Sequence, residues 1–235
     1  MLTRLLQVLL PSSCALCGMH SEGAVCAPCH AAHLHARLRC RQCANPVAAG
    51  TRRCGTCLAG GRAFDATLAA ADYASPLDQL VLGLKFGSQL ALAPWMAAQL
   101  HQALMKQQDF ELPQLLCPVP LGAQRLRERG FNQALEVARP LAALLGIDVQ
   151  AGLLVRARET VAQSSVAPAA RQQNIRNAFI VAPGGAALLA GQHVGLVDDV
   201  MTSGLTLDEL AALLKRHGAA RVSNLVFART PPHEN

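Results

Sequence analysis

Aromatic residues are scarce in this chain. Tryptophan, tyrosine and phenylalanine make up 3% of its 235 residues, as one Trp, one Tyr and six Phe. The hydrophobic content of 51% must therefore come mainly from Leu, Val and Ala. A surface that stacks successive nucleic-acid bases needs more aromatic rings than this, so we do not expect such a platform.

Charged residues and long apolar runs are also few. Asp, Glu, Lys and Arg together reach 15%, which is typical of a well-buried globular protein and not of a disordered one. No stretch approaches the roughly 18 apolar residues of a membrane-spanning helix. The apolar run at residues 5–10 contains Gln7 and is shorter than that of a secretory signal. We expect a soluble, cytoplasmic protein with no membrane span, in which residues 2–10 form an amphipathic helix.

Cysteine, in contrast, is abundant near the N-terminus. Eight of the nine cysteines form four CxxC pairs: Cys14 and Cys17, Cys26 and Cys29, Cys40 and Cys43, and Cys54 and Cys57. This spacing lets one turn present two thiolates to a tetrahedral zinc ion. We predict two structural Zn²⁺ sites, formed by the first four and the last four cysteines, with interleaved pairing as the alternative. A disulfide framework is disfavoured because no secretory signal is found.

The cysteine pairs suggest a division of the chain. Residues 1–62 are predicted to form a double zinc ribbon and residues 63–235 a second domain. About 60 residues bury too little apolar surface to fold alone, so metal would supply folding energy. Residues 1–60 hold six arginines and one acid, although two four-cysteine zinc sites would offset most of that charge. These arginines either form a basic face for nucleic acid or are simply solvated.

Strand-like and amphipathic segments alternate in the second domain. Residues 66–74, 115–119, 179–181 and 221–228 are predicted strands, and residues 76–84, 90–104, 132–145 and 207–217 are predicted helices. Asn132 can cap the third helix and Gly146 can end it. Trp95 and Cys117 are expected in the core. This alternation favours a parallel sheet flanked by helices.

Residues 194–206, VGLVDDVMTSGLT, are the most informative segment. An apolar strand runs into Asp198 and Asp199, and a turn of small residues leads to a helix. Ligands bind near the carboxyl ends of buried parallel strands, where paired carboxylates suit the hydroxyls of a diol or a metal. The following hydroxyl groups and the N–H groups that open the helix suit a phosphate. The pattern predicts a ribose 5-phosphate site, with an ordinary strand–turn–helix unit as the alternative.

Two arginine-rich segments could add anion sites. Arg125, Arg127 and Arg129 follow the strand at 115–119, where they form an anion site or line a helix face. Residues 156–177 lack apolar periodicity and contain several arginines. A long polar loop in a compact domain often acts as a lid.

The segment at 194–206 resembles the phosphoribosyl pyrophosphate (PRPP) signature of type I phosphoribosyltransferases, with Gly195 at a usually aliphatic position. The four CxxC pairs, CPVPLGAQRLRERGFNQ, RARETVAQ…RQQNIRNAF and LVDDVMTSGLT occur in the order seen in the ComF competence-protein family, which includes GntX-like proteins. This resemblance covers nearly the whole chain. It implies an α/β fold, with a type I phosphoribosyltransferase-like parallel sheet flanked by helices behind a small N-terminal zinc-ribbon domain.

The resemblance also implies a set of site residues. The PRPP-binding residues would be Asp198, Asp199, Met201, Thr202, Ser203, Gly204, Leu205 and Thr206. The pyrophosphate loop would be Leu121, Gly122, Ala123, Gln124 and Arg125. The flexible lid would include Arg156, Arg158, Thr160, Gln163, Arg171 and Asn174. Mg²⁺ would bind together with PRPP, and no chemical role is evident for RGFNQ at residues 129–133.

Two classes of function follow. The first is an enzyme, a phosphoribosyltransferase, although no acceptor-binding segment is recognisable. The second is a protein of DNA uptake or use of external DNA, as the family resemblance implies, with single-stranded DNA and uptake machinery as partners. In that case the PRPP fold would be accessory or regulatory, without turnover.

Overall fold

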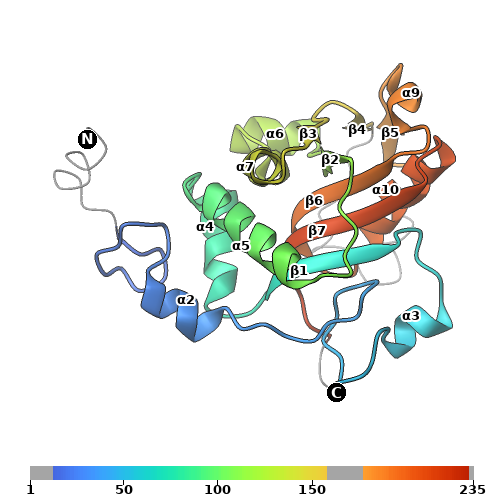
Figure 1. The fold of residues 1–235 in the computed structure, drawn as a ribbon. Coiled ribbons are helices and arrows are strands. Elements are labelled where there is room, and N and C mark those ends of the chain that lie inside the picture. The colour runs from blue at the N-terminus through green and yellow to red at the C-terminus, as the bar shows by residue number, and fades with distance from the viewer. Residues whose placement is uncertain (1–12, 158–176, 233–235) are drawn as a thin grey trace.

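The computed structural model describes residues 13–157 and 177–232, so the helix predicted at residues 2–10 lies outside the described part. A five-stranded parallel sheet forms the centre, in the order β1-β7-β6-β2-β3 (Figure 1). Its strands are β1 (Ala66–Asp72), β2 (Leu115–Pro118), β3 (Asp148–Val149), β6 (His193–Met201) and β7 (Arg221–Arg229). A separate antiparallel pair joins β4 (Leu154–Arg156) to β5 (Phe179–Val181). The predicted parallel sheet is confirmed.

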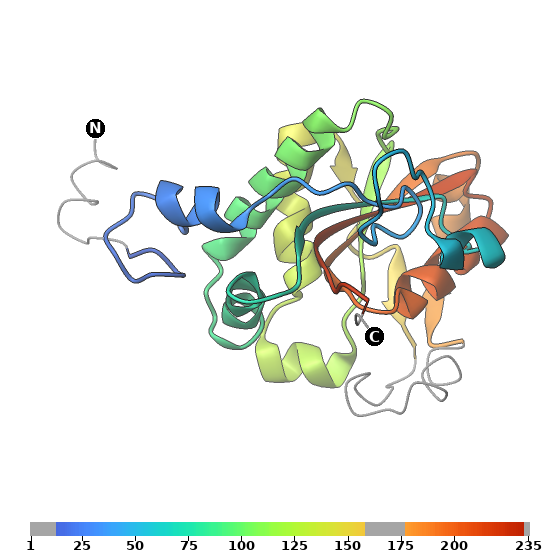
Figure 2. The ribbon, with the colours of Figure 1, turned by 90° about the horizontal axis from the view of Figure 1, so that it is seen from below.

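Helices cover both faces of the sheet. On one face lie α4 (Leu77–Phe86), α5 (Leu92–Lys106) and α7 (Gln133–Leu145), which share an apolar cluster. The opposite cluster contains α10 (Leu205–Arg216). Shorter helices are α2 (Ala27–His33), α3 (Gly55–Ala59), α6 (Ala123–Arg129) and α9 (Gly185–Leu189). Figure 2 shows α2 toward one end of the molecule and α3 toward the other.

The central strands are buried on both faces, as their apolar sequences predict. Gly195 in β6 illustrates how tightly they pack. A Cβ atom there would lie 2.7 Å from side-chain atoms of Leu116 and Pro113 and 2.9 Å from Leu225. Glycine at this usually aliphatic position therefore provides space for three neighbouring side chains.

Several local predictions are confirmed. The Asn132 side chain accepts a hydrogen bond from the Ala134 N–H at 3.0 Å and caps α7, which ends at left-handed Gly146. Cys117 is fully buried, and half-buried Trp95 packs edge-on to Phe227 with ring centroids 5.8 Å apart. The short elements α2, α3, α6, α9, β3 and β4 were not predicted, because their apolar patterns are too brief to show a period.

No helix in residues 13–157 or 177–232 combines the length and apolar character needed to cross a membrane. The cytoplasmic location and the domain boundary after residue 62 stay predictions.

Candidate functional site

Asp198 and Asp199 lie near the carboxyl end of β6, beyond the end of its neighbour β2. The β2 pairing stops at Pro118, opposite Val197, whereas β6 continues beside β7 to Met201. The two acids are therefore inside a strand and not just after it. The missing β2 neighbour leaves the edge of β6 open at the acid pair, as expected for a ligand site in an α/β sheet.

Asp199 is buried and already paired within the protein. Its side chain is 2% exposed, and its Oδ2 lies 2.6 Å from Lys85 Nζ at the end of α4. The Gln133 amide also donates to Asp199 Oδ1 at 3.5 Å. Burial alone would lower the pKa of Lys85, but the charge and hydrogen bond of Asp199, together with the charge of Asp198, outweigh it and raise that pKa above its ordinary value. Lys85 thus stays charged and fixes one carboxylate.

Asp198 is more available to a ligand. It is half-buried, and one of its oxygens accepts the Asp199 backbone N–H at 2.9 Å. Burial, and then the neighbouring Asp199 charge, raise the pKa of Asp198 well above its ordinary value. A hydroxyl donor or a cation at this carboxylate would relieve both effects.

The RGFNQ segment, whose role the sequence did not reveal, supports the acid pair. The Arg129 guanidinium lies over the Phe86 ring, 5.2 Å from its centroid, and donates to the Gln133 side chain. Gln133 in turn reaches Asp199. Asn132 donates to the Val119 carbonyl at 3.0 Å, which fastens the start of α7 to the end of β2. The segment therefore positions a chain of polar side chains behind Asp199.

The loop after β6 has the features expected of a phosphate site. Thr202 is exposed and Ser203 is half-exposed, so both hydroxyls can be reached. Gly204 is left-handed with φ 78° and precedes the first residue of the 12-residue α10. Ser203 Oγ accepts the Leu205 N–H at 3.4 Å. Met201, which was also predicted to bind PRPP, has a buried side chain, so only its backbone is near the loop.

The remaining predicted loops are described only in part. Leu121 and Gly122 precede α6, and the other three residues predicted for the pyrophosphate loop form its first turn. Arg125, Arg127 and Arg129 thus all lie in α6, and their use as an anion site stays a prediction. Of the predicted lid, Arg156 ends β4 and packs over Phe179 at 5.4 Å. The other lid residues, Arg158, Thr160, Gln163, Arg171 and Asn174, lie outside the described residues.

The eight N-terminal cysteines gather in two sequential tetrads. We call Cys14, Cys17, Cys26 and Cys29 the first tetrad, and Cys40, Cys43, Cys54 and Cys57 the second. All sulfurs within a tetrad lie within 4.8 Å of one another, and single Sγ–Sγ distances are 3.8 Å in the first and 3.5 Å in the second. Tetrahedral Zn–S bonds of about 2.3 Å place sulfurs roughly 3.8 Å apart. The geometry fits structural zinc and confirms sequential pairing.

Backbone N–H groups favour thiolates in both tetrads. Cys14 Sγ accepts the Cys26 N–H at 3.3 Å, and Cys40 Sγ accepts the Cys54 N–H at 3.3 Å. Burial alone would raise the pKa of each thiol, but these and neighbouring backbone bonds outweigh it. They lower the pKa of Cys14 to about 6 and that of Cys40 to about 7. Thiolates are the form that binds zinc.

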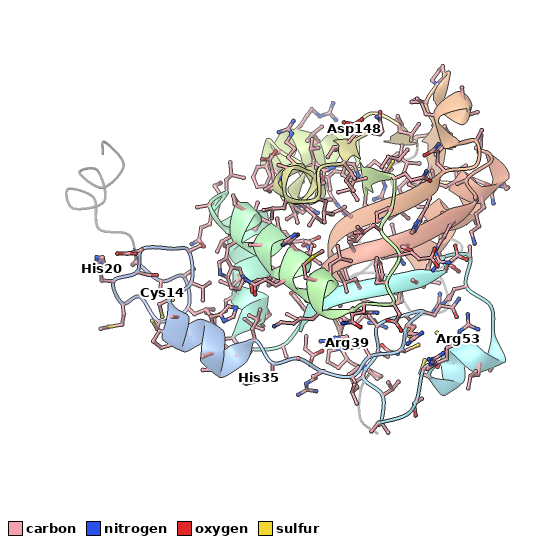
Figure 3. All side chains as sticks on the ribbon, viewed as in Figure 1. Cys14, His20, His35, Arg39, Arg53 and Asp148 are labelled. Carbon is pink, nitrogen blue, oxygen red and sulfur yellow. The ribbon has the colours of Figure 1, made fainter. Side chains whose placement is uncertain are left out.

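A groove of about 490 Å³ lies between α5, β1 and the segment between the first and second tetrads. The basic side chains along it are Arg37, Arg39, Arg41, Arg52 and Lys106. Arg39 and Arg37 pair with Asp72 at 2.7 and 3.1 Å, and Arg41 pairs with Asp109. Arg52 and Lys106 are exposed. Figure 3 labels Arg39, which lies on the segment between α2 and α3.

Comparisons with known proteins agree with both parts of the molecule. Residues 5–58 match the model of the double zinc ribbon domain, and residues 132–234 match that of the phosphoribosyl transferase domain. The parallel sheet, the acid pair and the hydroxyl-rich loop thus define a protein of phosphoribosyltransferase fold that carries an N-terminal double zinc ribbon.

Similar individual proteins show which family within this class the chain belongs to. "DNA utilization protein YhgH" of Salmonella typhimurium is 34% identical over 228 residues, covering 94% of this chain and 98% of the relative. The Escherichia coli K12 protein of the same name is 32% identical with the same coverage. "Competence protein F" of Haemophilus influenzae is 30% identical over 193 residues, covering 81% and 84%. This chain belongs to the ComF family.

Proposed function

We propose that this chain binds PRPP, or a related sugar phosphate, at the carboxyl end of β6. The observation that carries this proposal is one strand–loop–helix unit, in which a carboxylate pair precedes a loop of reachable hydroxyls and a helix N-terminus. Carboxylates accept hydrogen bonds from ribose hydroxyls, while helix N–H groups and loop hydroxyls bind a phosphate. One sugar phosphate would satisfy both parts of the unit, because its ribose hydroxyls would bond to the carboxylates and its phosphate to the loop and the helix N-terminus.

The charged residues then have different roles. Lys85 and Gln133 hold Asp199, so Asp198 is the carboxylate with capacity left for ribose hydroxyls. Arg125 and the backbone of residues 121–124 would meet the pyrophosphate, and the lid at residues 156–174 would exclude water. Mg²⁺ bound with PRPP would add the positive charge that offsets the pyrophosphate. Carboxylate oxygens such as those of Asp198 are the ligand type that this hard cation prefers.

Two uses of such a site are open to test. One is transfer of the phosphoribosyl group, in which C1 reacts through an oxocarbenium-like state. The other is binding without turnover, as a sensor or accessory activity. Repeated release of pyrophosphate from PRPP in the presence of candidate acceptors would identify a transferase. Binding with no release would identify the second use.

Calorimetry with PRPP and Mg²⁺ tests the site itself. Asp198→Asn keeps the shape and removes charge assistance from the carboxylate that has capacity left, whereas a change at Asp199 would also break its buried pair with Lys85. The loss should be about 1 kcal/mol, or roughly fivefold in affinity. Asp148→Asn is a matched control, because Asp148 is exposed at β3 on the sheet edge. If Asp198→Asn binds PRPP as well as wild type, the ribose assignment is wrong.

We also propose that the chain binds single-stranded DNA through the basic groove. The specific support is the concentration of basic side chains along one groove, together with the names of the relatives. Arg52 and Lys106 are exposed, whereas Arg37, Arg39 and Arg41 are bonded to Asp72 or Asp109. DNA-uptake machinery would then be the natural protein partner.

Salt dependence tests the electrostatic part of this second proposal. About four phosphate contacts predict a slope near −3 in log affinity against log salt, at roughly 0.7 per contact. Arg52→Glu with Lys106→Glu should abolish most binding. Arg139→Glu with Arg216→Glu changes the net charge equally on two exposed helix positions and should have little effect. Equal losses in both double variants would show that net charge, and not the groove, binds DNA.

A further inference from the structure

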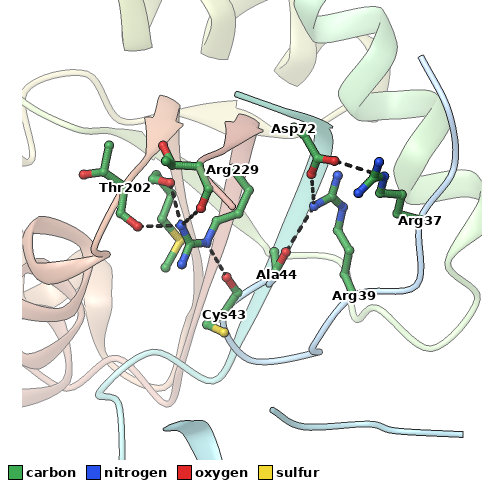
Figure 4. A network of polar contacts seen from close by, with 9 residues as sticks. Arg37, Arg39, Cys43, Ala44, Asp72, Thr202 and Arg229 are labelled. Carbon is green, nitrogen blue, oxygen red and sulfur yellow. Dashed lines mark hydrogen bonds and ion pairs between the residues drawn. The ribbon is translucent and has the colours of Figure 1, made fainter. Parts of the chain in front are cut away.

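Arg229, the last residue of β7, is a buried cation that bonds only to carbonyl oxygens. Its side chain lies between the loop after β6 and the second tetrad (Figure 4). Nε donates to the Cys43 carbonyl at 2.9 Å, and Nη1 faces the carbonyls of Met201 at 3.1 Å and of Thr202 and Thr230 at 2.5 Å. Arg229 is 6% exposed, and it forms no ion pair with any acid in the described residues.

A second arginine bonds to a carbonyl of the same loop. Arg62 Nη2 donates to the Ser203 carbonyl at 3.2 Å, and its Nη1 lies 3.6 Å from Asp208 in α10. The neighbouring Ala63 N–H also donates to Asp208 at 2.7 Å. Two arginines thus hold the carbonyls of three consecutive residues, from Met201 to Ser203.

The direction of these carbonyls fixes the direction of the loop N–H groups. In a trans peptide the C=O of one residue and the N–H of the next point in opposite directions. Carbonyls turned toward Arg229 and Arg62 therefore turn the N–H groups of Thr202, Ser203 and Gly204 away from the arginines. Successive N–H groups aimed at one side form a concavity that binds anions.

The charges on either side of Arg229 suit this arrangement. A buried cation without a carboxylate partner is costly. Here carbonyl dipoles solvate it, a four-thiolate zinc site with a formal charge of −2 would lie on one side, and the proposed phosphate would lie on the other. Within residues 13–157 and 177–232, no arginine bond links the first tetrad to this loop, and its ribbon contacts α5 through the hydrogen bond between His30 and Gln99.

We propose that Arg229, assisted by Arg62, is a positioning residue that couples the second tetrad to the phosphate loop, so that an intact second tetrad keeps the loop N–H groups aimed at a sugar-phosphate ligand. This proposal rests on the proposed function for the ligand. It adds that the second ribbon is part of the binding site, whereas the first ribbon is not.

The test uses the full-length, zinc-loaded protein and two readouts. One is the affinity for ribose 5-phosphate and for PRPP with Mg²⁺. The other is hydrogen–deuterium exchange at residues 202–205. Arg62→Met should speed exchange in the loop and weaken binding about tenfold, as expected for loss of a hydrogen bond from a charged group. Arg229→Lys should do the same, because one ammonium nitrogen cannot take the place of both Nε at the Cys43 carbonyl and Nη1 at the loop carbonyls.

Metal removal tests the coupling to the ribbons. Cys54→Ser with Cys57→Ser removes zinc from the second tetrad without touching Cys43, and should speed loop exchange. Cys14→Ser with Cys17→Ser is the matched control and should leave both readouts within twofold of wild type. Arg62 is accessible enough that its variant should fold even if Arg229→Lys does not.

The two proposals fail in different ways. If wild type binds neither sugar phosphate but loop exchange still depends on Arg62 and on the second tetrad, the ligand assignment fails and the positioning role stands. If Arg62→Met and the second-tetrad variant leave loop exchange unchanged, the positioning role is wrong, whatever the affinity. Equal effects from the two tetrads would also overturn it.

Discussion

The two cysteine tetrads share one CxxC spacing but meet the rest of the protein differently. Only Cys14 of the first tetrad is buried, and it lies in the cluster of α4, α5 and α7. In the second tetrad Cys40, Cys43 and Cys57 are all buried, in the cluster that contains α10 and the signature strand β6. The same metal motif is therefore peripheral in the first tetrad and part of the central core in the second.

This difference shows what a metal motif predicts and what it leaves open. The spacing of thiolates predicts coordination, because ligand geometry is set within a few residues. It does not predict what the folded module supports. In the second ribbon, the Cys43 carbonyl accepts a hydrogen bond from Arg229 at the end of β7, and Arg62 donates to the Ser203 carbonyl just before α10. In the first, one side-chain bond from His30 reaches α5.

Removing zinc from the second tetrad should have the largest effect. Zinc supplies roughly 10 kcal/mol or more of the folding energy of small modules, and here the module shares its core with α10. Cys54→Ser with Cys57→Ser should therefore lower the main thermal midpoint of the chain. Cys14→Ser with Cys17→Ser should unfold the first ribbon and leave the main transition nearly unchanged.

Metal analysis and calorimetry together check this difference. Wild type should hold two zinc ions per chain, one for each tetrad, and each double variant should hold one. Fewer than one zinc in reduced wild type would count decisively against both sites. Equal shifts of the main midpoint in the two variants would contradict the distinction between peripheral and central ribbons.

Lys85 in α4, on the face of the sheet opposite α10, contacts the acid pair directly through Asp199. Removing one partner of a buried ion pair leaves an uncompensated charge, so Lys85→Met should cost about 3 kcal/mol in the free energy of unfolding. Lys85→Arg keeps the charge and should recover part of the loss. Lys106→Met is the control, because Lys106 is exposed at the end of α5. Denaturant unfolding measures all three, and a loss no larger than that of the control would show that the Lys85–Asp199 contact contributes little.

The sequence predicted those parts of the site that are continuous in the chain. The acids, the hydroxyl-rich loop and the helix that follows lie within residues 194–206, so one local pattern revealed them. The CxxC pairs were equally local. Asn132 was found as a helix cap for the same reason, since its partner is the N–H of Ala134.

The parts that were missed depend on contacts across the fold. Lys85 ends α4, more than 100 residues before Asp199 in the sequence, and only the folded structure brings the two side chains together. Gln133 and Asp199 are 66 residues apart, and Arg229 and Cys43 are 186 residues apart. Arg229 is also harder to recognise because it binds carbonyl oxygens, which every residue has. No pairing of side-chain types could have revealed it.

Replacing Gln99 should have the smallest effect, and it tests selectively whether the first ribbon is coupled to the phosphate loop. Gln99 is buried in α5 and bonds to His30 of the first ribbon at 2.8 Å. Gln99→Ala should cost about 1 kcal/mol, the usual net value of one hydrogen bond. That loss should weaken the docking of the first ribbon only. Hydrogen exchange should therefore rise across residues 13–33 and stay unchanged at residues 202–205, with zinc content still two per chain. Gln102→Ala, three residues further along α5, is the matched control. If Gln99→Ala also speeds exchange in the phosphate loop, the first ribbon is coupled to the site after all, and the contrast between the two tetrads is one of degree.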